Sequence, residues 1–353
     1  MTKEAVTLLK KLIEIPSFSK EEARTADLLE KTLSAKGVAV HRLKNNVWAR
    51  NAHFDSAKPT LLLNSHHDTV KPCNGWTTDP FKANEIDGKI TGLGSNDAGA
   101  SLVCQLHTFL EVYDKALPFN VILAATAEEE ISGKNGIELL LPHLGENDFA
   151  IVGEPTGMGM AVAEKGLLVL DCTAHGKAGH AARDEGENAI YIAMQDIGWL
   201  RQYRFPNVSE TLGEVKMTVT CISAGSQHNV VPDRCNFTID IRTTDCYSNE
   251  EVLAILKKNL RSEVKARSTR LNASGVPAGH PILGVAKKLG LRTFGSPTLS
   301  DQALMPFPSV KTGPGNPARS HTADEFVFAK EIEKGIEVYL NIINSLELAD
   351  KGR

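Results

Sequence analysis

Hydrophobic positions recur at the spacing of one helix face near both ends of the chain. The pattern predicts a helix over residues 3–14 and a long final helix over residues 324–346. Ser19 and Glu22 have the spacing of a capping box, so we expect them to start a second helix. Helices are therefore predicted near both ends of the chain, and the hydrophobic pattern between them decides the fold class.

Three short runs between these helices are apolar at every position. They cover residues 60–63, 121–125 and 149–152, and such runs are typical of strands that are buried on both faces. Helical patterns over 98–113 and 136–141 separate them, which predicts an α/β fold with a mostly parallel, covered sheet. Ligands bind beyond the carboxyl ends of strands in such sheets. We therefore expect the polar residues that follow each run to converge.

The pattern changes after residue 165. Strand-like and helical segments follow in nearly a β-α-β-β-α-β order, with helices predicted over 188–203 and 250–264. This order indicates an inserted α+β domain of the ferredoxin-like kind. We predict a catalytic domain in two parts around this insertion, with the boundaries 1–165, 166–270 and 271–353.

The composition of the chain mainly excludes classes of partner and location. A chain of 353 residues is long enough for two domains, and a net charge of -4 without a basic stripe argues against nucleic-acid partners. No apolar run is long enough to cross a bilayer, and the N-terminus lacks a signal-peptide pattern. The six cysteines are scattered, so we read them as reduced thiols of a cytoplasmic protein that has no membrane partner.

The first apolar run ends in Ser65-His66-His67-Asp68-Thr69. A histidine at a strand end can bind zinc through one ring nitrogen while a carboxylate accepts the N–H of the other. Adjacent residues of an extended chain point to opposite sides, so His66, which shares its side with Asp68, is the candidate ligand and His67 is not. This pair is weak evidence by itself, because a capped loop has the same residues.

The second run leads directly into Glu128-Glu129-Glu130. Three adjacent carboxylates repel one another unless cations neutralise them. A solvated acidic loop is the alternative, but it is weakened by the apolar strand that precedes the triplet. If Glu130 binds a metal, Glu129 points to the other side and can act as general base on water. Glu154, directly after the third run, offers one more oxygen ligand.

Asp97 lies in a glycine-rich segment that does not fit a dinucleotide-binding motif, because its spacing is not GxGxxG. A carboxylate in such a turn suits a bridging metal ligand. The donor set of histidine and carboxylates without cysteine suits zinc, or else cobalt or manganese. One histidine and one carboxylate for each ion, with a shared aspartate, would form a two-metal site.

Taken together, these clusters resemble in order and spacing the di-zinc deacylases and exopeptidases that include acetylornithine deacetylase and succinyl-diaminopimelate desuccinylase. The resemblance covers essentially the whole chain. It implies that His66 and Glu154 bind one zinc ion and that Glu130 and His321 bind the other. It also implies that Asp97 bridges the two ions. Cobalt or manganese could substitute for zinc.

The same resemblance implies roles for residues outside the metal site. Asp68 would orient His66, Glu129 would be the catalytic base, and His180 would reach across a homodimer to stabilise the oxyanion in the partner's site. Further positions resemble those that contact the substrate, and they are Asn229, Arg242, Gly313 and Gly315.

The implied activity is hydrolysis of the amide bond of an N-acyl amino acid. N-acetylornithine is the first expectation, with N-acetyl or N-succinyl forms of ornithine or citrulline beside it, as in arginine biosynthesis. A dipeptidase, an aminoacylase or a succinyl-diaminopimelate desuccinylase on the same scaffold is the alternative. A non-catalytic metal-binding scaffold is a remote third reading, since every proposed position is filled. The segment at Ser300-Asp301 departs from the acetylornithine enzymes, which leaves the acyl group and the amine open.

Overall fold

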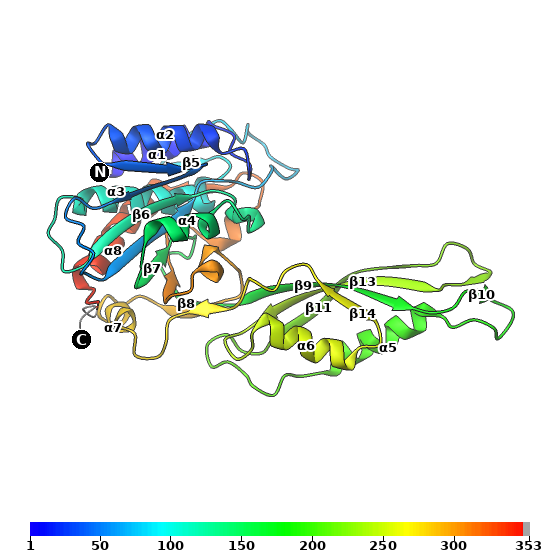
Figure 1. Cartoon of the computed structure of the whole chain (residues 1–353). Helices are drawn as coiled ribbons and strands as arrows, with labels where there is room; N and C mark the ends of the chain where they lie inside the picture. The colour runs from blue at the N-terminus through cyan, green and yellow to red at the C-terminus, as the bar shows by residue number, and fades with distance from the viewer. Residues whose placement is uncertain (349–353) are drawn as a thin grey trace. The chain divides into compact units, whose positions relative to one another are not determined.

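The computed structural model describes residues 1–348 and divides them into two compact units (Figure 1). Unit 1 comprises residues 1–162, residues 275–294 and the chain from Ser300 onward, whereas unit 2 comprises residues 163–274 and 295–299. The sequence pattern predicted the insertion over residues 166–270. The short segment 295–299 belongs to unit 2, which the sequence pattern did not indicate. The last five residues of the predicted third segment lie outside the described residues.

A mixed sheet forms the centre of unit 1. Its strands lie in the order β1 (Val40–Leu43), β2 (Asn46–Arg50), β6 (Asn120–Thr126), β3 (Thr60–His66), β7 (Phe149–Val152) and β17 (Ser309–Lys311). The central strands β6, β3, β7 and β17 are parallel, while β1 and β2 add an antiparallel edge. This confirms the α/β class with a mostly parallel sheet. The sheet continues through β8 (Met160–Glu164), β15 (Ser274–Gly275) and β16 (Thr293–Ser296).

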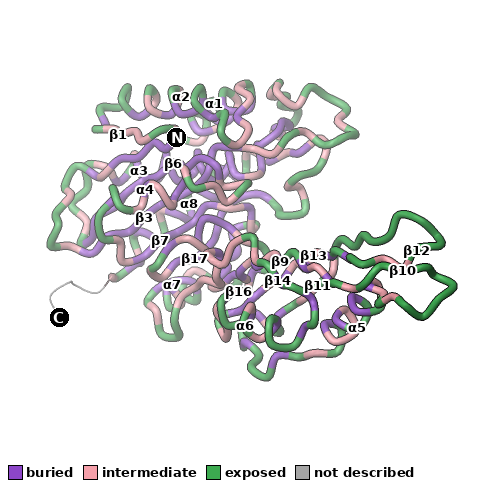
Figure 2. Tube along the Cα trace, turned by 45° about the vertical axis from the view of Figure 1, so that its right-hand side comes forward, coloured by how far each residue is buried: buried purple, intermediate pink, exposed green. Residues whose placement is uncertain are grey.

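Helices cover both faces of this sheet, as the continuous apolar runs predicted. Leu61 and Leu63 belong to the larger core, which five helices share, whereas Leu62 lies in a second core on the other face with Leu140. The alternation follows from the period of two along a strand. Figure 2 shows these strands as buried. The helices of the larger core are α1 (Thr2–Ile13), α2 (Ala23–Ser34), α3 (Ala100–Val112), α7 (Pro281–Lys288) and α8 (Ala329–Ser345), and that of the second core is α4 (Ile137–Leu144).

The register of the parallel strands brings their carboxyl ends to one edge. His66, the last residue of β3, pairs with Thr126, the last residue of β6. Asn64 of β3 pairs with Val152, the last residue of β7. The three polar clusters that follow these strands therefore begin side by side, which confirms the predicted convergence of the strand ends.

The predicted start of the final helix was wrong. Helix α8 begins at Ala329, not at Asp324, which has a positive φ of 55°. Residues Phe326–Phe328 instead form strand β18, which pairs with β5 (Lys89–Thr91) in a small sheet that also contains β4 (Asn84–Ile86). Strand pairing thus overrides the helical periodicity of these residues.

The predicted capping box was also wrong. Helix α2 begins at Ala23 without a side-chain cap. The hydroxyl of Ser19 donates instead to Asp68 Oδ2 at 2.7 Å, and the buried carboxylate of Glu22 accepts from the backbone N–H of Lys20 at 2.5 Å. Contacts with the segment after β3 therefore take the hydroxyl that would have capped the helix.

Unit 2 has the predicted β-α-β-β-α-β order. Its antiparallel sheet has the strand order β11 (Lys216–Ala224), β13 (Arg234–Thr243), β9 (Gly166–His175) and β14 (Glu263–Ala266). Helices α5 (Ala189–Gln202) and α6 (Asn249–Asn259) pack their apolar faces on this sheet. The predicted helix over 250–264 was too long, since it ends at Asn259 and residues 263–266 form β14. A separate ribbon pairs β10 (Gly179–His180) with β12 (Val230–Val231).

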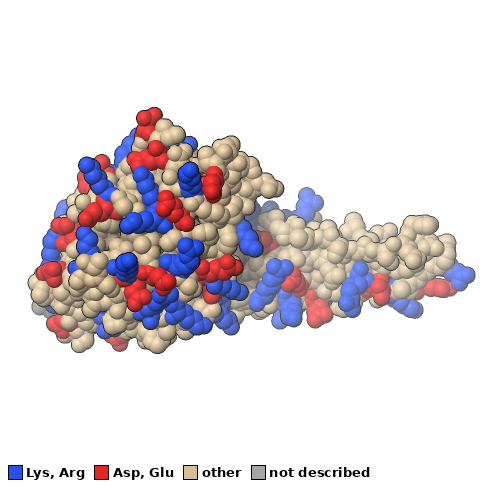
Figure 3. All heavy atoms as spheres, turned by 90° about the horizontal axis from the view of Figure 1, so that it is seen from above, with Lys and Arg blue, Asp and Glu red and all other residues tan. Residues whose placement is uncertain are grey.

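Surface and composition add little that constrains the function. Within residues 1–348 no helix combines the length and the apolar character that a membrane span requires. The six cysteines are free thiols. Basic and acidic side chains are interspersed over the face in Figure 3, so that face offers no basic stripe to a nucleic acid.

Candidate metal centre

His66 is the centre of a buried polar cluster in unit 1. Its Nδ1 lies 3.0 Å from the main-chain oxygen of Asp68, which can only accept, so Nδ1 carries the proton. The lone pair of Nε2 then faces the cluster, and this buried atom has no hydrogen-bond partner among the described residues. Carboxylate oxygens surround Nε2 at 3.4 Å (Asp97), 3.8 Å (Glu154) and 3.9 Å (Glu129).

Asp97 lies between two histidines. Its Oδ1 faces His66, and its Oδ2 lies 3.6 Å from His321 Nε2. That same nitrogen is 3.0 Å from Glu130 Oε2. The loop from Ser95 to Gly99, just before α3, carries Asp97, while His321 comes from the segment before β18, so residues distant in sequence meet here. The arrangement gives each oxygen of Asp97 its own histidine.

A cation would stabilise the buried carboxylates of this cluster. Burial and then the charge of Asp97 raise the pKa of Glu154 to about 8. Burial likewise raises the pKa of Glu129 well above its usual value, although His66 opposes the shift. Burial alone would lower the pKa of His66, but the carboxylates raise it well above normal. The cluster thus attracts a positive charge at His66 Nε2, where a proton and a metal ion would compete.

The donor atoms fit metal ions. Two overlapping groups have ligand atoms within 4.8 Å of one another, namely His66 with Asp97 and Glu130, and His66 with Glu129 and Glu154. Oxygen and imidazole donors of this kind suit zinc, cobalt or manganese. The orphaned Nε2 of His66 and the crowded carboxylates are the features that a bound cation would satisfy.

Comparison with known proteins decides the family. The sequence matches peptidase family M20/M25/M40 over residues 62–345. The chain belongs to this family. It is accordingly a metal-dependent amidohydrolase. The match begins within β3 and ends at the last residue of α8, so it includes all the residues of the polar cluster.

The relatives of this M20 chain are named for hydrolysis of different acyl groups. It is 28% identical to the acetylornithine deacetylase of Proteus mirabilis, over 99% of this chain and 98% of that protein. It is 26% identical to the succinyl-diaminopimelate desuccinylase of Corynebacterium glutamicum, over 91% of each. The fold is similar to that of the YXEP protein of Bacillus subtilis, described as a dinuclear metal binding peptidase. The TM-score is 0.75 at 16% identity, over 98% of this chain and 99% of that one.

At the polar cluster of this M20 chain, the two adjacent histidines His66 and His67 have different surroundings. The ring of His67 lies between Thr25 Oγ1 at 2.9 Å and the main-chain oxygen of Asn45 at 2.8 Å. Burial lowers the pKa of His67 to about 4, so this ring stays neutral. The structure therefore brings His66 into the cluster and leaves His67 outside it.

The three adjacent glutamates also divide. Glu128 has a positive φ of 56°, and its carboxylate accepts hydrogen bonds from the backbone and side-chain nitrogens of Asn135. A short 3₁₀ turn, Glu129–Ile131, then carries the next two carboxylates into the cluster. Asp68 holds this turn by accepting from the backbone N–H groups of Glu129 and Glu130.

Three residues predicted from the resemblance lie in unit 2. His180 is exposed, and its Nδ1 accepts from the N–H of Ala182, so Nε2 carries the proton and has no hydrogen-bond acceptor within residues 1–348. Asn229 is exposed on the segment before β12, and its main-chain carbonyl accepts from the N–H of Ala181. Arg242 makes two hydrogen bonds to Asp240, at 2.9 and 3.1 Å. None of the three belongs to the cluster of unit 1.

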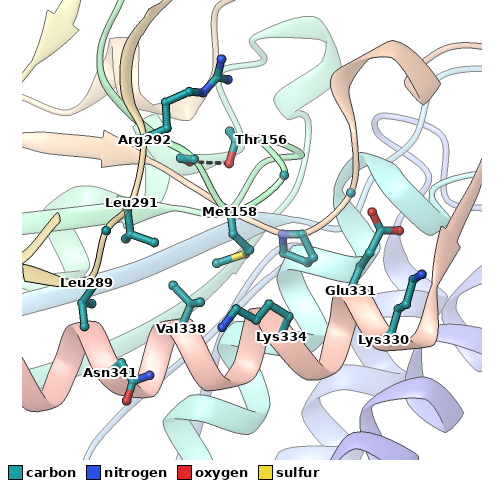
Figure 4. Close-up of a pocket in the computed structure, with 15 residues that line it drawn as sticks. Thr156, Met158, Leu289, Leu291, Arg292, Lys330, Glu331, Lys334, Val338 and Asn341 are labelled. Carbon is teal, nitrogen blue, oxygen red and sulfur yellow. Dashed lines mark hydrogen bonds between the residues drawn. The ribbon is translucent and has the colours of Figure 1, made fainter. Parts of the chain in front are cut away.

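The two predicted glycines have different surroundings. Gly313 has no room for a side chain, because a Cβ would collide with Ser101 and with the backbone of Glu154. Gly315 has a positive φ of 87° and lines a cavity of about 660 Å³ beside α8 (Figure 4). Met158, Leu291 and Lys334 also line this cavity, whereas no predicted metal ligand does.

Sequence reasoning missed two buried acids near the cluster. Asp301 Oδ2 accepts from Thr126 Oγ1 at 2.7 Å, and burial raises the pKa of Asp301 to about 6. Glu325 is 2% exposed and contacts the backbone of the Asp97 loop. An acid directly ahead of an apolar triplet, four residues after His321, was the signal for Glu325. Nothing in the local sequence marks Asp301 as buried.

Proposed function

We propose that this chain is a deacylase of N-acyl amino acids with two zinc ions in each subunit. The observation that carries the proposal is the position of Asp97, with one oxygen toward His66 and the other toward His321. A carboxylate between two histidines suits a bridging ligand of a two-metal site. The carboxylate of Glu129, which this proposal does not use as a ligand, lies 3.9 Å from His66 Nε2 and suits a general base.

In this proposal His66 and Glu154 hold one ion, and Glu130 and His321 hold the other. The short separations within each pair, 3.8 Å and 3.0 Å between the facing atoms, support the assignment. Cobalt or manganese would fit the same donors. The B. subtilis neighbour, described as dinuclear, supports the number of ions.

The bound ions would polarise the acyl carbonyl and lower the pKa of the attacking water. Glu129 accepts a proton from this water, whose oxygen forms a bond to the acyl carbon. The amide C–N bond then breaks, and Glu129 passes the proton to the leaving nitrogen. The products are a carboxylate and a free amino acid. The carboxylate of Asp68 keeps Glu129 in place by accepting a hydrogen bond from the backbone N–H of Glu129.

The substrate proposal is an N-acetyl or N-succinyl amino acid, with N-acetylornithine first and the citrulline derivative beside it. The similarity to an acetylornithine deacetylase over nearly the whole of both chains supports this choice. The similar desuccinylase makes N-succinyl-diaminopimelate the main competitor. We assign the substrate carboxylate to Asn229 and Arg242 and the acyl end to the loop Gly313 to Gly315.

We also propose a homodimer, formed through unit 2, in which His180 donates a hydrogen bond to the oxyanion in the partner subunit's site. Strand β11 is an edge of its sheet and most of its residues are exposed. Tyr191 and Met194 on α5, with Ile222 on β11, are large apolar side chains that remain more than half exposed. A sheet edge and exposed apolar side chains of this kind favour pairing with a second copy about a twofold axis. A cytoplasmic location suits the six free cysteines.

A substrate panel tests the proposal. The purified protein would be assayed with N-acetyl and N-succinyl forms of ornithine, citrulline and diaminopimelate, and with dipeptides, while its metal content is measured on the same sample. We expect two equivalents of zinc and the highest kcat/KM for an N-acyl amino acid. Preference for dipeptides would replace the deacylase by a dipeptidase. Absence of turnover on every substrate, with and without added metal, would remove the enzymatic proposal.

A further inference from the structure

Glu325 is a buried carboxylate with an unusual set of partners. Its Oε1 accepts hydrogen bonds from the backbone N–H groups of Asn96 and Asp97, at 2.7 and 2.8 Å. Its Oε2 accepts from the backbone N–H of Gly94 at 3.0 Å. Its main-chain oxygen accepts from the N–H of Gly92 at 2.9 Å. One residue thus binds four amides of a single loop.

This loop cannot satisfy those amides by itself. Asp97 has the non-helical dihedrals φ -117° and ψ 101°, so the loop lacks the regular ladder that begins in α3. A buried N–H without a partner destabilises the fold, and the two oxygens of one carboxyl group can accept several such donors. The carboxylate of Glu325 therefore replaces the missing ladder and fixes the path of the backbone at Asp97.

The same acid ties the Asp97 loop to the segment of His321, four residues before Glu325 in the chain. A second link lies beside it, because the Asn96 amide group binds Asn316 N at 2.9 Å and Ser320 Oγ at 3.2 Å. The two connected segments present the two groups that face each other at 3.6 Å, Asp97 Oδ2 and His321 Nε2. Both connections therefore lie next to the groups whose separation matters for the cluster.

We propose that Glu325 is a positioning residue that sets the distance between Asp97 and His321. It thereby secures the second metal ion, the one assigned to Glu130 and His321. The proposal rests on the two-metal site described under Proposed function. Glu325 belongs to neither group of potential ligands, and both its oxygens are already occupied by backbone amides. It acts on the metal site only through the residues that it holds.

Glu325→Gln is the informative variant. It preserves the shape of the side chain but replaces one acceptor oxygen by an NH₂ donor, which must face either the N–H of Gly94 or those of Asn96 and Asp97. Residues that support metal ligands in this way typically change metal affinity about 10- to 100-fold when substituted. We expect a loss of this size at one of the two ions, and a lower kcat with little change in KM.

Asp196→Asn provides a matched control in unit 2. Asp196 is 3% exposed and accepts from the backbone N–H groups of Arg261 and Ser262 and from Ser262 Oγ. It is therefore another buried carboxylate that holds the backbone of a distant segment, without any link to the metal cluster. We expect Asp196→Asn to lower the unfolding temperature and still to bind two metal ions with wild-type affinity.

The measurement is zinc stoichiometry and affinity, by equilibrium dialysis with elemental analysis and by competition with a chelator. Two tight ions in wild type and a weakened second ion in Glu325→Gln support the proposal. Two ions at wild-type affinity in Glu325→Gln overturn it. If Glu325→Gln does not fold, Glu325→Asp, which keeps the charge but is one methylene shorter, must show the weakened second ion or the proposal fails. Fewer than two ions in wild type would instead remove the two-metal function itself.

Discussion

The carboxylate of Asp68 accepts a hydrogen bond from the backbone N–H of Glu129, with 3.0 Å between Oδ1 and the nitrogen. The same Oδ1 lies 3.5 Å from His66 Nδ1, and the main-chain oxygen of Asp68 binds that nitrogen at 3.0 Å. One buried acid thus holds both the first candidate ligand and the turn that carries the candidate base. The role expected for Asp68 from sequence, orientation of His66, is only half of what its contacts allow.

Asp68→Asn tests this double contact. The new NH₂ group must face either the backbone N–H of Glu129 or that of Glu130, and two donors cannot bond to each other. We expect zinc affinity and kcat to fall about 10- to 100-fold, with KM little changed, measured by chelator competition and steady-state kinetics.

Ser19→Ala is the control for Asp68→Asn. It removes only the hydroxyl that donates to Asp68 Oδ2 and leaves the carboxylate charge intact. We expect a much smaller loss of kcat than in Asp68→Asn. Equal losses in the two variants would contradict a specific role for the contacts of Asp68 with the Glu129 turn.

Glu129→Gln separates the base from the ligands. Loss of a general base lowers turnover by about 10²- to 10⁴-fold. Because Glu129 is not one of the assigned ligands, both zinc ions should remain bound. Glu128→Gln is the neighbouring control, since the oxygens of Glu128 bind Asn135. Near-normal turnover in Glu129→Gln with both metals present would assign the proton transfer to another group.

Much of this site follows from sequence because parallel strands align their ends. The apolar runs that became β3, β6 and β7 located the edge of the sheet, and the polar residues after them could only lie there. Alternation along an extended chain also separated His66 from His67. These inferences depend on local periodicity and on the geometry of a parallel sheet, both of which a sequence records.

The remainder depends on contacts between distant segments. Ser19 had the local signature of a helix cap, but Asp68 takes its hydroxyl. The start of the last helix was misplaced because Phe326–Phe328 pairs with β5, which no local pattern reveals. Asp301 looks like an ordinary loop acid until the fold buries it against Thr126, and the weak signal at Glu325 does not reveal its contact with the Asp97 loop.

Glu154→Gln should have opposite effects on the metal-free and metal-loaded protein. Without cations, burial and then repulsion from Asp97 raise the pKa of Glu154 to about 8, so folding at neutral pH forces this acid to take up a proton. A neutral amide removes this cost, so at neutral pH the metal-free variant should melt at a higher temperature than the metal-free wild type. The variant also loses a ligand, so zinc should stabilise it less.

Thermal unfolding with a chelator and with excess zinc measures both effects of Glu154→Gln. A ligand at about 100 times its dissociation constant stabilises the folded state by about 2.7 kcal/mol, which sets the scale for wild type. Glu333→Gln, on the exposed surface of α8, should change neither melting temperature. A metal-free Glu154→Gln protein that melts below metal-free wild type would contradict a destabilising effect of Glu154 in the absence of metal.

Met194→Glu tests the proposed dimer surface. Met194 is 59% exposed on α5, and a charge there would be buried without a partner if two copies met through this face. We expect the variant to run as a monomer in size-exclusion chromatography with light scattering. Ile86→Glu, at a side chain of 62% exposure in unit 1, is the control and should leave the dimer intact. A dimeric Met194→Glu protein would move the interface elsewhere.

The cross-subunit role of His180 can be tested with heterodimers of two differently tagged chains. In a heterodimer of Glu129→Gln with His180→Ala, one site combines an intact Glu129 with the intact His180 of the other chain. It should therefore have about half of the wild-type activity per dimer, since one of two symmetric sites works. A heterodimer of wild type with the Glu129→Gln/His180→Ala double variant should be inactive, because each site lacks one group. The reverse result, with only the second heterodimer active, would assign His180 to the site of its own chain.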